Sequence, residues 1–105
     1  LEGAGTQPQP IMAAAERRRR MLLSLASAPG GPREAVERLR PPVFGPRRDA
    51  LLADCARWPA PRLEQALRLV HDTERRLRAP GPRPSRALAE RCLVRLAMMA
   101  GPARR

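Results

Sequence analysis

The chain has 105 residues, enough for one compact domain and not for two, so we expect a single domain over residues 1–105. All 21 basic residues are arginine and only 10 residues are acidic, and the resulting net charge of +11 favours contact with polyanions. One Trp and one Phe are too few rings for a typical single-strand nucleic-acid binder, and no apolar run approaches the ~20 residues of a membrane span.

Proline and glycine divide the chain into five segments in which apolar residues recur at helical spacing. Residues that favour strands are scarce, and apolar and polar residues nowhere alternate for long. We therefore predict an all-α fold, a compact bundle of about five helices. The predicted helices cover residues 10–26, 32–40, 47–58, 61–81 and 85–100.

The first predicted helix combines four consecutive arginines, in AERRRRMLL, with an apolar stripe. The arginines span about 300° of the helix circumference, so they cannot all face solvent beside a buried stripe. Arg18 lies between the stripe positions Ala15 and Leu22, where an unpaired buried charge would cost several kcal/mol. Three interpretations stay open: a solvated rim, a subunit interface and a phosphate-binding site. The predicted stripe contains Ile11, Ala14, Ala15, Leu22 and Leu25.

The second predicted helix is short, and its apolar face consists of Val36 and Leu39. The connector PPVFGP follows it. We expect Val43 and Phe44 in this connector to fill a gap between helices, because exposing them would forgo about 2 kcal/mol of burial energy each.

The third predicted helix ends at a tryptophan that precedes a proline. Pro59 disfavours helical backbone at Trp58 and so closes the helix. We interpret Trp58 as a packing anchor at the helix end and not as a platform for a ligand. The face predicted to be buried contains Leu51, Leu52 and Cys55.

The fourth predicted helix has the clearest pattern in the chain, with apolar residues at i, i+3, i+4 and i+7. Acidic residues precede arginines at i, i+4, and arginines gather in the last turn, where the helix dipole favours cations. His71 lies beside the stripe and is interpreted as a surface or boundary residue. The stripe contains Leu63, Ala66, Leu67, Val70 and Leu77, and the predicted pairs are Glu64–Arg68, Asp72–Arg76 and Glu74–Arg78.

The fifth predicted helix begins at Ser85, a favourable N-cap residue, and ends before Gly101 and Pro102. Its inner face is predicted to contain Leu88, Cys92, Leu93, Leu96 and Met99.

Residues that could carry chemistry are few. Cys55 and Cys92 form no C-x-x-C pair, and together with the lone His71 they do not suffice for a metal site. We interpret both cysteines as small buried side chains in a reducing cytosol. No hydrolase triad, Walker, H-E-x-x-H or G-x-G-x-x-G signature is present. We therefore predict a cytoplasmic, non-enzymatic domain with no catalytic residue, cofactor or metal.

Most of the chain resembles a known family. The run RLRPPVFGPRRDALLADCARWPAPRLEQALRLVHDTERRLRAPG, continued by RALAERCLVRLA, resembles the C-terminal region of the delta subunit of bacterial DNA polymerase III. The upstream GTQPQPIMAAAERRRRMLLSLA is similar to the helix that opens the same domain, so the resemblance extends over residues 5–100. PPVF, the following Trp–Pro helix start and the A-L-x-x-x-x-x-x-E-R-x-L register carry most of it.

The resemblance implies a helical collar domain of a clamp-loader subunit whose N-terminal AAA+-like domains are not in this chain. Such a domain does not hydrolyse ATP. It joins the collar domains of the gamma/tau and delta-prime subunits, within the holoenzyme of a DNA-directed DNA polymerase. The sliding clamp and DNA would be contacted only through the complex, and no membrane is involved. The predicted partner interface contains Arg17, Arg18, Arg19, Arg20, Arg68, Arg75 and Arg76.

An alternative from a different class is a free-standing basic helical module that binds nucleic-acid phosphates. The net charge supports this alternative, and it predicts affinity for unrelated duplexes that falls steeply with salt.

Overall fold

The fold is an all-α bundle of five helices. The computed structural model describes residues 8–82 and 84–102, and this part of the chain contains no strand. The bundle is elongated, with extents of 47 × 29 × 26 Å. The helices are α1 (Pro8–Ser27), α2 (Gly31–Val36), α3 (Gly45–Arg57), α4 (Ala60–Arg78) and α5 (Ser85–Met99).

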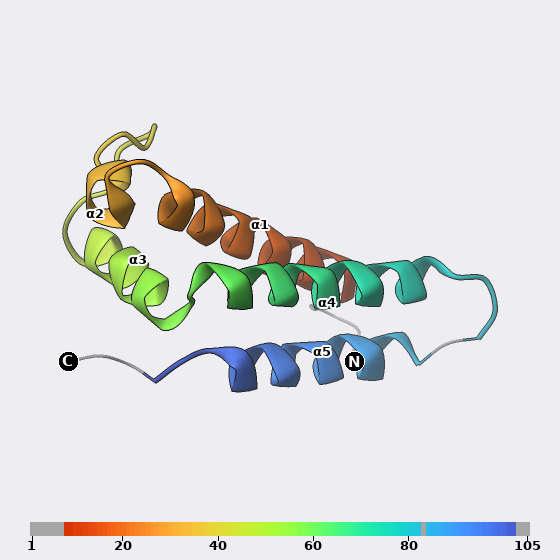
Figure 1. Cartoon of the computed structure of the whole chain (residues 1–105). Coiled ribbons are helices and arrows are strands. Elements are labelled where there is room, and N and C mark those ends of the chain that lie inside the picture. The colour runs from red at the N-terminus through yellow and green to blue at the C-terminus, as the bar shows by residue number, and fades with distance from the viewer. Residues whose placement is uncertain (1–7, 83, 103–105) are drawn as a thin grey trace.

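The two longest helices, α1 and α4, form the centre of the bundle and pack side by side. The fifth helix lies along α4 and also contacts α1, whereas α2 and α3 close one end (Figure 1). Prolines in the first turn open α2, α3 and α4, where a missing N–H costs no helical hydrogen bond. Among the residues that the structure describes, no helix combines the length and the apolar character needed to cross a membrane.

The predicted helices are confirmed, with one marked difference in extent. The second helix ends at Val36 and not at residue 40. Beyond it the chain continues in tight turns, in which the N–H of Leu39 donates to the carbonyl of Val36 at 3.3 Å. Between α1 and α2, Gly30 adopts φ 85°, a conformation that L side chains rarely adopt, and this turns the chain back onto α1.

The dry core is built mainly from the stripe of α4 and the facing stripe of α1. All five predicted stripe residues of α4 are buried, as are Cys92 and Leu96 of α5. On α1 the prediction was wrong in part, because Met12 is fully buried while Ala14 is exposed. The buried residues are Met12, Ala15, Leu22, Leu25, Ala35, Val36, Leu51, Trp58, Leu63, Ala66, Leu67, Val70, Leu77, Ala89, Cys92 and Leu96.

The two aromatic residues have opposite environments. Trp58 is 4% exposed at the C-terminal end of α3, so its prediction as a packing anchor is confirmed. Phe44 is 75% exposed, so the prediction that it fills a gap between helices was wrong. Its extended backbone forms the N-cap of α3, and its carbonyl accepts the N–H of Arg48, while Val43 alone of the pair packs against the core.

Candidate functional site

Two of the four consecutive arginines of α1 are paired with acids of this same chain. The Nε and Nη2 of Arg18 donate to Oδ2 of Asp54 on α3, at 3.1 and 2.5 Å. The Nε of Arg20 donates to Oε2 of Glu16 at 2.8 Å. Arg18 is therefore not an unpaired charge, and its carboxylate comes from a neighbouring helix of the same chain, 36 positions away.

The arginine on the buried side of α1 is Arg19 and not Arg18. Its Cζ lies 5.0 Å from the centroid of the Trp58 ring, a distance at which a cation is attracted to the ring face. Its Nη1 donates to the carbonyl of Ala15 at 3.3 Å, while its Nε is buried without a hydrogen-bond partner. Burial lowers the pKa of Arg19, although a guanidinium keeps its charge at neutral pH.

The remaining residues of the predicted interface are exposed. On α4, Arg75 and Arg76 both pair with Asp72, at 2.7 and 3.3 Å. Arg17 and Arg68 form no ion pair with any residue that the structure describes. The seven arginines therefore do not form one unpaired cationic surface. The predicted ion pair between Glu64 and Arg68 is not formed, whereas the predicted pair between Asp72 and Arg76 is. Contact of the seven arginines with a partner stays a prediction.

A polar junction joins α1 to α4 near the middle of the bundle. The Nε2 of His71 lies 3.0 Å from Oε2 of Glu16, and both side chains are partly exposed, as predicted for His71. The hydrogen bonds from His71 and then Arg20 lower the pKa of Glu16 from its ordinary value of 4.5.

This junction predicts a pH dependence of stability. Because the folded state lowers the pKa of Glu16, its contribution is complete above pH 4.5 and is lost as the pH falls through the lower folded value. We expect Glu16→Gln to be less stable than wild type at neutral pH and to lose less stability on acidification. Urea unfolding over a series of pH values measures this. Equal slopes in the two proteins would contradict the assignment.

Helix α5 presents a second apolar face on its outer side. Val94 is 58% exposed and Met98 is 79% exposed, and a spacing of four residues places them next to each other on the helix. Ala87 and Ala97 are exposed on the same helix, as is Arg95. A helix that is apolar on both sides is typical of a buried element, yet nothing in the described parts of the chain covers this side of α5.

The orientation of α5 is held by hydrogen bonds at its C-terminal end. The N–H of Gly101 donates to the carbonyl of Arg57 at 2.8 Å, and Nε of Arg57 donates back to the carbonyl of Gly101 at 2.9 Å. Arg62 of α4 donates to the carbonyl of Met99 at 3.1 Å. These bonds satisfy carbonyls at the helix end and fix which side of α5 faces outward.

The prediction from sequence covers only the inner face of α5 and gives Val94 and Met98 no role. The segment LVRLAMM contains apolar residues all around the helix, and this pattern was the signal that could have revealed the second face.

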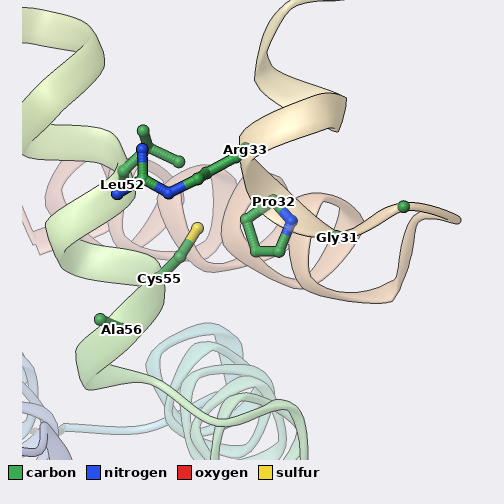
Figure 2. Close-up of a pocket in the computed structure, with 7 residues that line it drawn as sticks. Gly31, Pro32, Arg33, Leu52, Cys55 and Ala56 are labelled. Atoms are coloured by element: carbon green, nitrogen blue, oxygen red, sulfur yellow. The ribbon is translucent and has the colours of Figure 1, made fainter.

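A cleft of about 390 Å³ lies between the first turn of α2 and the C-terminal half of α3. Figure 2 shows the Cys55 sulfur directed towards Pro32, with Arg33 extending over Leu52. Burial raises the pKa of the Cys55 thiol, so the thiol stays protonated and is a poor nucleophile at neutral pH. The protonated thiol gives no support to covalent catalysis at Cys55.

Comparison of the chain with protein families, with curated proteins and with solved structures gave no match.

Proposed function

We propose that this chain is a non-catalytic assembly domain, the collar domain of a delta-like clamp-loader subunit of DNA polymerase III, and that it acts in loading the sliding clamp during replication. The observation that carries the assembly role is the exposed apolar face of α5 around Val94 and Met98. Exposed apolar side chains that adjoin one another on a rigid helix are typical of a protein–protein interface. The clamp-loader identity is supported by the sequence resemblance and agrees with the all-α fold.

The partners in this proposal are the collar domains of gamma/tau and delta-prime. The apolar face is flanked by two arginines and one glutamate, Arg91, Arg95 and Glu90, so it suits a partner with an apolar centre and a polar rim of mixed charge. The arginines of α1 are less suited to direct contact, because Arg18 and Arg20 are already paired within the chain and Arg19 is half-buried.

Copurification with tagged gamma/tau and delta-prime tests the proposal. The wild-type chain should associate with at least one of them at micromolar concentration. Val94→Asp combined with Met98→Asp should weaken the association about 30-fold or more, because charged side chains would be desolvated in the interface. Isothermal titration calorimetry measures the loss, and circular dichroism checks that the variant is folded.

Phe44→Asp is a control, because it introduces an aspartate at another exposed apolar residue, in the loop before α3. It should leave the association unchanged. No association of the wild-type chain with either partner, or equal losses in the control and in the α5 variant, would contradict the proposal.

Binding of nucleic-acid phosphates is the second candidate, and the charge of +11 favours it. Exposed arginines without an ion pair among the described residues come from all five helices and include Arg17, Arg33, Arg47, Arg68 and Arg91. Fluorescence anisotropy with unrelated duplexes at ~50 mM salt tests this candidate, since binding that depends on phosphates should be strong there and collapse as salt rises. Undetectable binding at that salt concentration would eliminate it.

A further inference from the structure

Three potential metal ligands from two helices converge at the junction of α1 and α4. Glu16 of α1 and His71 and Glu74 of α4 each offer one ligand atom, and all three atoms lie within 4.8 Å of one another. His71 and Glu74 are three positions apart, which places them on the same face of α4. The site combines an imidazole with two carboxylates, and so differs from a cluster of acidic residues alone.

The spacing fits a transition-metal ion after a small adjustment. Zinc binds imidazole nitrogen and carboxylate oxygen at ~2.0–2.2 Å, so two ligands of one tetrahedral ion lie roughly 3.3–3.6 Å apart. The Glu16 oxygen and the His71 nitrogen lie 3.0 Å apart and no pair of the three atoms exceeds 4.8 Å, so movements of roughly 1 Å in these partly exposed side chains bring the atoms to the spacing of a tetrahedral site. Three protein ligands would leave a fourth position of a tetrahedral ion for water.

The junction also has one carboxylate, that of Glu74, whose negative charge is not balanced by an ion pair among the described residues and so favours a cation. Glu16 is paired with Arg20, whereas Glu74 forms no ion pair with any residue in the described ranges. Imidazole and carboxylate donors suit zinc and its neighbours in the first transition series. Arg20 is the competing cation, because it shares Oε2 of Glu16 with His71.

We propose that Glu16, His71 and Glu74 form a binding site for a divalent transition-metal ion of the zinc class. A bound ion links α1 to α4 across 55 positions of the chain and stabilises their packing. The site is independent of the assembly function proposed above and lies on other residues than the exposed face of α5.

Titration of the chelator-treated chain with zinc chloride tests the site. Isothermal titration calorimetry should show one ion per chain, and the Tm should rise by roughly 5–15 °C at saturating zinc. Glu74→Gln should weaken zinc binding about 10-fold or more, because it removes a ligand. This variant should fold normally without metal, since Glu74 has no ion pair or side-chain hydrogen bond among the described residues.

Three further variants separate this site from adventitious binding. Glu64→Gln makes the same change at an exposed position of α4 outside the cluster and should bind zinc as the wild type does. Cys55→Ser should also keep the binding, which excludes capture of zinc by the thiol. Arg20→Gln should strengthen binding about two- to fivefold, because it removes the competing cation.

Zinc binding that survives Glu74→Gln at full strength would overturn the proposal. Loss of binding in Cys55→Ser or an equal loss in Glu64→Gln would overturn it as well. His71→Gln should abolish the rise in Tm, and if that variant does not fold, Glu74→Gln still decides the outcome.

Discussion

Replacing Trp58 with alanine should reduce the free energy of unfolding by about 3–5 kcal/mol, a large part of the stability of a domain of this size. Trp58 is 4% exposed at the end of α3, so its removal leaves a cavity in the core. The half-buried Arg19 would at the same time lose the ring that faces its guanidinium. Urea unfolding monitored by circular dichroism measures the change.

The other aromatic residue provides the control for this prediction. Phe44 is 75% exposed, so Phe44→Ala should change the free energy of unfolding by no more than about 0.5 kcal/mol. Trp58→Phe, which keeps an aromatic ring, should be less damaging than Trp58→Ala. Similar losses for Trp58→Ala and Phe44→Ala would show that Trp58 does not anchor the core.

Helix α4 was predictable from sequence because several local signals agree on it. Its apolar residues keep one helical register from Leu63 to Leu77, and Pro61 and Gly81 indicate where the helix begins and ends. A helix with a single apolar stripe can bury only that face, so the buried residues can be predicted from the stripe. The agreement of start signal, stripe and last-turn arginines explains why this prediction is confirmed.

Helix α1 shows why the surroundings of the consecutive arginines were harder to predict. Apolar residues precede the arginines on more than one side of the helix, so the pattern does not determine whether Ala14 or Met12 faces the core. That choice depends on the packing of α4 and on Asp54 of α3, which pairs with Arg18 from 36 positions away. Contacts between helices that are distant in sequence thus decided that Arg19 is the half-buried arginine.

The sequence of α5 does not determine which side faces the core, because apolar residues occupy both sides of the helix. The reciprocal bonds between Gly101 and Arg57 orient the helix, and they involve a glycine that sequence alone marks only as a helix end. Leu96 consequently faces the core, whereas Val94, two positions earlier, faces outward. The two sides of α5 therefore have different tasks, one in the fold and one in the proposed association.

Alanine substitutions at these neighbouring positions should separate the two tasks. Leu96 is 1% exposed, so Leu96→Ala should lower the free energy of unfolding by about 2–5 kcal/mol through lost burial and a new cavity. Val94 is 58% exposed, so Val94→Ala should change it by no more than about 0.5 kcal/mol. Urea unfolding of both variants measures the difference. A large loss from Val94→Ala would mean that this side of α5 is already covered by the chain itself, and a partner could then not dock there.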